Sequence, residues 1–376
     1  MQNKKEINIG IVGAQFMGRA HSNAWFDVAQ FYDLPLEPVM MAACDINPAA
    51  GKDFANRFGW LSFETSWETL VNRNDIDIID ICTPNHLHMP IAIAAAKAGK
   101  HVICEKPAAM NAGEALQMMN AAEEAGVKHM IAFNYRRLPA IGLAKKMILE
   151  GKLGEIHHFN AVYYQDWLVD PDFPWVWRHD VKLAGSGAHG DMNAHTVDLA
   201  RFLVGEIDSV CGEEKVFISK RKIPETDRFG EVTADDATSF LARFTNGTSG
   251  NFIATRFATG RKNYLRLEIF GSKGSLIFNL ERLNELEYYS SENHSMEQGF
   301  RNIMVTENEH PYIDKWWPPG HIIGWEHTFI HEIGDFLLAI ADNGKIEPDF
   351  GDGYQCQKIL DAVMESSKSR KWIDIL

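Results

Sequence analysis

The sequence has little cysteine, and none of it is arranged as a redox or structural metal motif. Its 376 residues contain 5 cysteines, with no Cys-x-x-Cys pair: Cys44, Cys82, Cys104, Cys211 and Cys356. An odd number of thiols cannot all pair within one chain, so we expect reduced thiols in a cytoplasmic protein. The sequence also lacks a run of about 18 apolar residues, and its first apolar stretch is too short for a signal peptide.

Basic residues are in deficit. Lysine and arginine together number 37 against 51 aspartates and glutamates, which gives a formal net charge of −14. This balance argues against nucleic acid or an anionic membrane as the main partner. A composition with 45% hydrophobic and 23% charged residues excludes intrinsic disorder, and the length predicts two domains. No internal repeat or low-complexity linker is visible, so we expect the domains to share a close interface.

The first 135 residues alternate between short apolar runs and helix-like segments. The apolar runs cover residues 7–12, 39–44, 76–82, 101–104 and 129–133. Helical patterns of 10 to 15 residues separate most of them, and Pro48 stands at the start of one, where a missing N–H costs nothing. Strands that alternate with helices predict a parallel sheet covered on both faces. We therefore predict an α/β, doubly wound domain over residues 1–135.

Residues 136–376 have a different hydrophobic pattern. Alternating segments follow one another with few helices between them, at residues 155–164, 209–218, 238–244, 249–257, 264–270, 275–279 and 285–290. Asn246-Gly247 and the stretch 271–274 are strong turn patterns. We expect one helix at about 190–204 and two more at about 325–341 and 353–369. This pattern predicts an α+β domain with an open, mainly antiparallel sheet.

The first apolar run leads into a glycine-containing loop. Gly13-x-Gln15-x-x-Gly18 stands between a predicted strand and a predicted helix, as a dinucleotide-binding fingerprint does. Gln15 replaces the middle glycine, and a plain strand–helix turn is the alternative interpretation. Asp45 ends the second apolar run, where a carboxylate accepts hydrogen bonds from an adenosine ribose and repels a 2′-phosphate. Together these residues favour binding of NAD over NADP.

Two further motifs follow predicted strands. Thr83-Pro84-Asn85 and Glu105-Lys106-Pro107 each come directly after an apolar run. Ligands of open α/β sheets bind at the carboxyl ends of the strands. A lysine in this position can hydrogen-bond a substrate hydroxyl and favour its alkoxide-like form. A solvated surface ammonium is the alternative for Lys106.

A carboxylate and an imidazole are spaced for one helix face in the second domain. Asp191 and His195 are four residues apart on the helix predicted at 190–204. A carboxylate one turn from an imidazole can orient it as a general base. Asp198, three residues beyond His195, is an alternative partner. The other interpretation is an N-terminal aspartate favoured by the helix dipole and a core histidine.

Other patterns are weaker. His327 and His331 are four residues apart, but no third ligand is evident, so an amphipathic helix face is favoured and no metal is expected. Trp167, Trp175 and Trp177 suit either sugar stacking or a core or subunit interface.

In combination these motifs resemble the Gfo/Idh/MocA oxidoreductases. The resemblance rests on the glycine loop, Asp45, Thr83-Pro84-Asn85-x-x-His88, Glu105-Lys106-Pro107, Asn134-Tyr135-Arg136 and Asp191-x-x-x-His195-x-x-Asp198. It implies an NAD-binding Rossmann domain and a second domain that binds substrate and builds homodimers or homotetramers. It also implies that Lys106, Asp191 and His195 are catalytic. Gln15 and Asn193 depart from the glycines that many members have at these positions.

We also expect two sets of binding residues. Those expected at the cofactor are Gly13, Gln15, Phe16, Met17, Gly18, Asp45, Ile46, Thr83, Pro84, Asn85, His88, Glu105, Lys106 and Asn134. Those expected at the substrate are Lys106, Tyr135, Gln165, Asp166, Trp167, Arg178, Asp191 and His195.

The sequence thus predicts an NAD-dependent dehydrogenase that oxidises a secondary hydroxyl of a carbohydrate. The stretches around His21 and Trp177 are similar to those of members that oxidise levoglucosan or glycosides at C3. The substrate is then a sugar, anhydrosugar or glycoside. The alternatives are an inositol or polyol dehydrogenase, a glycosidase that uses NAD for transient C3 oxidation, and a non-catalytic sugar or NAD sensor.

Overall fold

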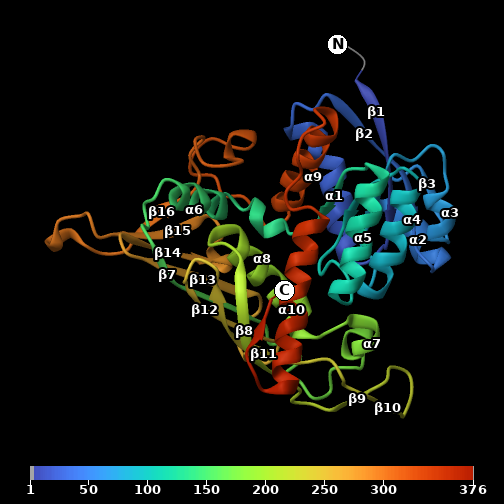
Figure 1. The fold of residues 1–376 in the computed structure, drawn as a ribbon. Helices are drawn as coiled ribbons and strands as arrows, with labels where there is room; N and C mark the ends of the chain where they lie inside the picture. Colours follow the sequence, from blue (N-terminus) through green and yellow to red (C-terminus); the bar gives the residue numbers. More distant parts are fainter. Residues whose placement is uncertain (1–3, 376) are drawn as a thin grey trace. The chain divides into compact units, whose positions relative to one another are not determined.

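The computed structural model describes residues 4–375, which divide into two units (Figure 1). Unit 1 runs to Arg137 and also contains Gly324–Gln355. Unit 2 contains Leu138–Ile323 and the chain from Cys356 onward. None of the helices in the described part of the chain is both long and apolar enough to cross a membrane.

Unit 1 is built on a six-stranded sheet with the order β3-β2-β1-β4-β5-β6, and all neighbouring strands are parallel. Its strands are β1 (Lys5–Val12), β2 (Leu36–Cys44), β3 (Ser62–Glu64), β4 (Ile78–Ile81), β5 (His101–Cys104) and β6 (His129–Ile131). The order reverses between β1 and β4, as in a Rossmann fold, and ligands of such sheets bind at this point. The predicted doubly wound α/β fold is confirmed.

Local sequence signals explain where two helices of unit 1 begin and end. They are α1 (Phe16–Phe31), α2 (Pro48–Phe58), α3 (Trp67–Val71), α4 (His88–Lys97), α5 (Ala112–Ala125) and α9 (His327–Ala341), with short 3-10 turns at Asn85–Leu87 and Asn134–Arg137. The Asn47 side chain accepts hydrogen bonds from two N–H groups at the start of α2, and Gly59 ends that helix with a φ of 81°. Asn111 and Gly126 begin and end α5 in the same way.

Helix α9 belongs to unit 1, although the predicted ranges placed it in a second domain that runs from 136 to 376. It packs on α1: the ring of Phe329 lies 5.2 Å from that of His21. A Cβ on Gly334 would lie 2.6 Å from the Tyr32 ring, so glycine permits the close approach of α9 to Tyr32. These contacts join segments some 300 residues apart, and local sequence patterns do not carry such pairings.

Unit 2 contains a nine-stranded sheet with the order β16-β15-β14-β13-β7-β12-β11-β8-β17. These strands are β7 (Ile156–Tyr164), β8 (Ile207–Lys215), β11 (Ala237–Phe244), β12 (Ser249–Thr255), β13 (Tyr264–Gly271), β14 (Gly274–Asn279), β15 (Glu285–Ser290), β16 (Arg301–Met304) and β17 (Ile373–Asp374). Strands β9 (Lys220–Lys222) and β10 (Phe229–Glu231) form a separate pair. Only β7 and β12 pair in parallel among the described strands of this unit, so the mainly antiparallel prediction is confirmed.

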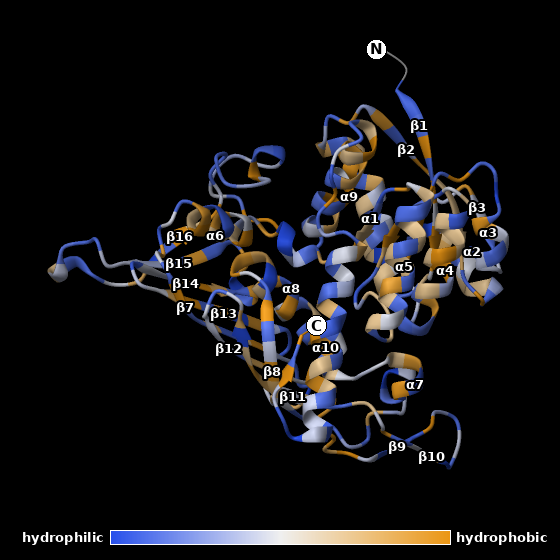
Figure 2. Ribbon diagram, viewed as in Figure 1, coloured by the Kyte–Doolittle hydropathy of each residue, from blue (hydrophilic) through white to orange (hydrophobic). Residues whose placement is uncertain are grey.

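The sheet of unit 2 has a buried apolar face, and hydrophobic residues recur along its strands (Figure 2). In β11 every second residue is buried, and Phe240 stacks on Phe252 of β12 with ring centroids 4.4 Å apart. The helices are α6 (Pro139–Leu149), α7 (Val181–Ala184), α8 (Ala194–Leu203) and α10 (Phe350–Ser369), and α10 begins among residues of unit 1. Short 3-10 turns occupy Trp177–His179, Leu280–Arg282, Ser295–Glu297 and Ile313–Lys315.

Glu214 of β8 makes the stability of the protein dependent on pH. Burial raises the pKa of this carboxyl to about 7, and the nearby charge of Asp235 acts in the same direction. The folded protein therefore holds a proton that the unfolded chain releases near pH 4.5, and this stabilisation is lost as the pH rises through about 7. We expect Glu214→Gln to unfold at higher urea than the wild type at pH 8, with the difference vanishing near pH 5.

Glu213, its exposed neighbour on the same strand, provides the matched control. Glu213→Gln should unfold at wild-type urea concentrations at both pH values. If both variants unfolded at equally higher urea concentrations than the wild type at pH 8, the effect would come from net charge and not from burial of Glu214.

Candidate active site

The loop after β1 has a geometry that only glycine permits at two positions. Gly13 has a φ of 109°, and a Cβ there would lie 2.5 Å from the Cys82 carbonyl oxygen. A Cβ on Gly18 would lie 1.9 Å from the Gly13 carbonyl oxygen. The two glycines therefore let the first turn of α1 pack directly on the end of β1. Gln15 has an extended backbone with a φ of −87°, so this position does not need glycine for its own conformation.

Asp45, at the end of β2, is tied to this loop. Its carboxylate accepts hydrogen bonds from the Ala14 N–H at 3.1 Å and from the Asn47 N–H at 2.9 Å. The side chain is thus fixed beside the glycine loop at the strand end where an adenosine ribose is expected. Ile46, the next residue, is 90% exposed.

The start of α1 is suited to a diphosphate. The described first turn contains no acidic residue, and no side chain caps it. The positive end of a helix dipole and its free N–H groups attract phosphate oxygens. Phe16 is 65% exposed, and its ring stacks on Trp325 with centroids 5.5 Å apart and planes within 5°. Together with the two glycines and Asp45, these features fit a dinucleotide.

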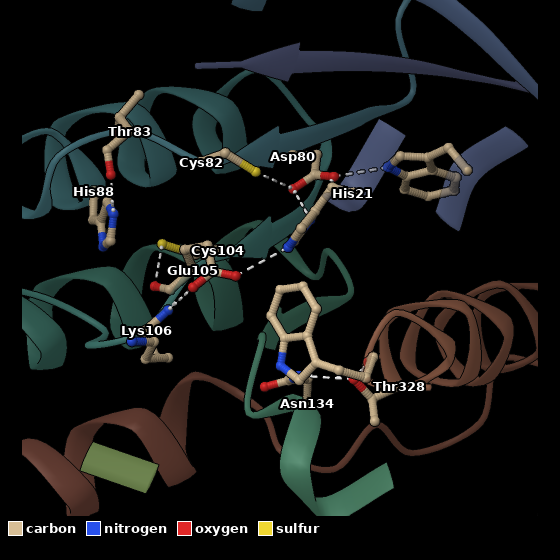
Figure 3. A network of polar contacts seen from close by, with 12 residues as sticks. His21, Asp80, Cys82, Thr83, His88, Cys104, Glu105, Lys106, Asn134 and Thr328 are labelled. Atoms are coloured by element: carbon tan, nitrogen blue, oxygen red, sulfur yellow. Dashed lines mark hydrogen bonds and ion pairs between the residues drawn. The ribbon is translucent and has the colours of Figure 1, made fainter. Parts of the chain in front are cut away.

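The ends of β4 and β5 are held together by a histidine. His88 is buried, and its ring nitrogens lie 2.9 Å from the Pro107 carbonyl oxygen and 3.0 Å from that of Thr83 (Figure 3). Burial lowers the pKa of His88, and the contacts of its ring with the Thr83 and Pro107 carbonyls oppose this effect. Its side chain thus contacts the protein's own backbone, and its expected contact with a cofactor stays a prediction. Asn134, after β6, donates to the Thr328 hydroxyl of α9 at 2.8 Å.

Lys106 follows β5 beside a buried polar network. The Glu105 carboxylate accepts the Lys106 backbone N–H at 3.1 Å and lies 3.0 Å from Nε2 of His21. The other ring nitrogen of His21 lies 3.0 Å from the carboxylate of Asp80. Sequence reasoning identified Lys106 and Glu105 but assigned no role to His21 or Asp80. They lie 59 residues apart in the chain, and only their convergence in space reveals the network.

In unit 2 the segment that carries Asp191 is a π-helical turn, His189–Asn193, followed by α8. The predicted regular helix at 190–204 therefore differs from the structure in its first turn, and the i,i+4 rule for one α-helical face does not apply across it. Asn193 and His189 hold this turn: the His189 Nδ1 lies 3.1 Å from the Asn193 amide, and its Nε2 lies 3.0 Å from the Leu360 carbonyl oxygen.

A buried aspartate fixes the entry to the π-helical turn. The Asp235 carboxylate accepts hydrogen bonds from the N–H groups of Gly187 and His189 and from the Thr238 hydroxyl. A Cβ on Gly187 would lie 1.8 Å from the Asp235 carbonyl oxygen, so glycine is required there. This is the physical reason for Gly187, one of the glycines that precede Asp191 in the sequence.

Asp191 forms an ion pair with Arg256 at 2.8 Å. The expected role of Asp191 is to orient His195 or to bind a neighbouring hydroxyl, and no sequence motif indicates the arginine, which directly follows β12. Arg256 is 2% exposed and lies over the Trp167 ring, 5.1 Å from its centroid. The ring of His195 lies 6.1 Å from that of Tyr163 on β7. Arg256 thus holds the Asp191 carboxylate in place in the turn that precedes α8, the helix of His195.

The predicted substrate residues of unit 2 form a connected set. Gln165 accepts the Trp167 indole N–H at 2.8 Å and donates to Asn263 at 2.9 Å, and Asn263 also accepts the Tyr163 hydroxyl. Burial lowers the pKa of Arg178, and the charge of Asp191 opposes this effect, so the guanidinium lies near that carboxylate.

Two other predicted substrate residues are differently placed. Asp166 is bound to Lys262 at 2.8 Å and to the Gly260 N–H at 3.0 Å. These hydrogen bonds lower the pKa of Asp166 and hold its carboxylate against the loop before β13. Tyr135, in unit 1, is only 4% exposed. Contact of either side chain with a substrate stays a prediction.

Comparison with known proteins identifies the family. Residues 7–133 match the oxidoreductase family with an NAD-binding Rossmann fold, and residues 141–277 match the GFO/IDH/MocA C-terminal domain. A levoglucosan dehydrogenase of Pseudarthrobacter phenanthrenivorans is 42% identical over 100% of this chain and 99% of its own. The chain belongs to the Gfo/Idh/MocA oxidoreductase family.

Further members of this family extend the comparison. A solved levoglucosan dehydrogenase in complex with NADH and levoglucosan has a TM-score of 0.96 and 42% identity, covering 99% of this chain and 100% of its own. A glucose-6-phosphate 3-dehydrogenase of Bacillus subtilis is 25% identical over 96% of both chains. The chain is thus an oxidoreductase whose cofactor is NAD, which confirms the predicted family, enzyme class and cofactor.

Removal of the Asp45 carboxylate should weaken NAD binding. Asp45→Ala loses the ribose acceptor and the hydrogen bond to Ala14, and we expect the Kd for NADH to rise about tenfold, roughly 1.4 kcal/mol. Fluorescence titration with NADH measures it. Asp53→Ala on α2, whose side chain is 72% exposed, serves as the control. An unchanged Kd for Asp45→Ala would remove this carboxylate from the cofactor site.

Proposed function

We propose that this protein is an NAD-dependent dehydrogenase that oxidises a secondary hydroxyl, at C3, of a sugar, anhydrosugar or glycoside. The observation that carries the proposal is the retention of a lysine at the end of β5, in unit 1, together with the Asp191–Arg256 pair and His195 in unit 2. The full-length similarity to levoglucosan dehydrogenase supports an anhydrosugar as substrate. The name of the glucose-6-phosphate relative supports C3.

In the proposed reaction Lys106 binds the hydroxyl that is oxidised. Its ammonium donates a hydrogen bond to the hydroxyl oxygen and stabilises the negative charge that develops when the proton leaves. The backbone is held on both sides of Lys106. The Glu105 carboxylate accepts the Lys106 N–H, and the His88 ring contacts the Pro107 carbonyl. A fixed backbone limits the positions that the ammonium can take.

His195 accepts the hydroxyl proton in this mechanism. Asp191 accepts a hydrogen bond from a neighbouring hydroxyl of the sugar, and Arg256 keeps its carboxylate charged and oriented. Trp167 and Gln165 stand beside Arg256 and provide an apolar ring face and an amide for the sugar. NAD, held by Gly13, Gly18 and Asp45, supplies the acceptor for the hydride that the same carbon loses.

Growth of absorbance at the NADH wavelength tests the proposal. The purified protein is mixed with NAD or NADP and with levoglucosan, glucose, methyl glucosides and inositols. We expect NADH formation with levoglucosan or another pyranose, and much slower formation with NADP because Asp45 repels a 2′-phosphate. If only inositols were oxidised, the substrate would be a polyol and not a sugar. Cleavage of a glycoside without net NADH would indicate a redox-assisted glycosidase.

Replacement of Lys106 should remove turnover and spare cofactor binding. We expect Lys106→Ala to lower kcat by 10²-fold or more, on the order of the contribution of one preorganised donor, with the Kd for NADH within a few-fold of wild type. Steady-state rates and NADH titration measure the two effects. Lys97→Ala, which removes an exposed lysine of α4, is the control. A variant at position 106 with wild-type kcat would exclude this lysine from the mechanism.

A further inference from the structure

A buried imidazole joins two carboxylates beside the strand end that carries Lys106 (Figure 3). His21, on α1, is fully buried. Its Nδ1 lies 3.0 Å from Asp80 on β4, and its Nε2 lies 3.0 Å from Glu105, directly after β5. The three side chains therefore connect the first helix of the Rossmann unit to the ends of two neighbouring strands.

The hydrogen-bond donors of this network define its charge. An ionised carboxylate only accepts hydrogen bonds, so His21 has to donate from both nitrogens and is an imidazolium. Burial, the largest single effect, lowers the pKa of His21, but the charge and hydrogen bond of Asp80 together with the interactions of Cys82 outweigh it and hold the pKa well above its usual value. Asp80 also accepts the Trp25 indole N–H at 2.7 Å and the Cys82 thiol.

The other titratable groups around His21 are neutral. Burial raises the pKa of the Cys82 and Cys104 thiols, which therefore keep their protons. Burial also raises the pKa of Glu332 on α9 well above its usual value, and the charge of Glu105 adds to this effect while that of His21 opposes it. The charged members of the network are thus His21, Asp80 and Glu105.

Glu105 connects this network to the proposed catalytic lysine. One carboxylate oxygen faces His21, and the other accepts the backbone N–H of Lys106. The imidazolium therefore fixes the orientation of the Glu105 carboxylate. Without it a carboxylate that is 4% exposed would lose its charge-assisted hydrogen bond to Nε2, which is costly in the interior.

We propose that His21 is a positioning residue, which acts through Glu105 to set the position and the electrostatic environment of Lys106 during substrate oxidation. This inference rests on the proposed role of Lys106 as the group that binds the reacting hydroxyl. The glycine loop is connected to the same network, because His21 lies on α1, only three residues after Gly18.

A metal centre is the alternative for the same atoms. His21, Asp80 and Cys82 offer ligand atoms within 4.8 Å of one another. However, each nitrogen of His21 already faces a carboxylate, and the thiol of Cys82 keeps its proton, whereas a metal ligand has to be deprotonated. The arrangement therefore favours an imidazolium bridge.

His21→Gln tests the inference, with His101→Gln as the matched control. His101 is a half-buried histidine at the amino end of β5, where it accepts the Lys128 N–H. Its replacement therefore changes a hydrogen bond at the end of the strand opposite to Glu105. The readouts are melting temperature, Kd for NADH, and kcat and kcat/KM as functions of pH with the sugar that the wild type oxidises.

We expect His21→Gln to lower kcat on the order of tenfold or more, with the Kd for NADH changed far less. Loss of the positive charge beside Glu105 should favour the ammonium form of Lys106 and move the alkaline limb of the pH profile to higher pH by about half a unit or more. His101→Gln should lower the melting temperature and leave the pH profile in place. A His21→Gln profile that overlays the wild type would overturn the inference.

Two further measurements do not depend on the folding of that variant. In the wild type labelled with ¹⁵N-histidine, both ring nitrogens of His21 should carry protons at pH 8, and a neutral ring would overturn the inference. Glu105→Gln should reproduce the kcat loss, and the double variant should be no worse than the poorer single one. Additive losses, or a stoichiometric metal in the purified protein, would also overturn it. A wild type that oxidises no sugar would instead contradict the proposed function.

Discussion

The contact between Gly18 and the Gly13 carbonyl is the constraint on which the cofactor site depends. Because neither residue has a Cβ, α1 starts directly at the end of β1. The start of α1 therefore lies at the carboxyl ends of the strands, where Asp45, Thr83 and Glu105 also follow their strands. A side chain at Gly18 would push the helix away from the strand.

The interior behind this edge is unusually polar for a Rossmann core. His21, Asp80 and Glu105 are all buried, and a buried charge is tolerated only when it is paired and hydrogen-bonded. Here each charge has a partner at 3.0 Å, and the indole of Trp25 adds a further donor. A buried ion pair is weak evidence for stability, and the fixed geometry of this network suits a role in positioning.

In unit 2 a buried, hydrogen-bonded carboxylate likewise holds a π-helical turn in place. The π-helical turn of His189–Asn193 leaves the regular helical pattern, and the buried carboxylate of Asp235 compensates by accepting backbone N–H groups at its start. The result is a fixed Asp191, held in addition by Arg256. Asn193, which departs from the glycine expected at its position, has a clear task here because it holds His189.

The sequence by itself determined the doubly wound fold, the antiparallel texture of the second unit, the glycine loop and Asp45, because these depend on local periodicity and on backbone conformations that few residues allow. Its motifs also predict catalytic roles for Lys106, Asp191 and His195, which stay predictions. The assignment of α9 to the first unit, the π-helical turn, the Arg256 partner of Asp191 and the His21 network were decided by tertiary structure. Each of these depends on groups that are distant along the chain, where propensity and spacing carry no information and only packing brings the charges together.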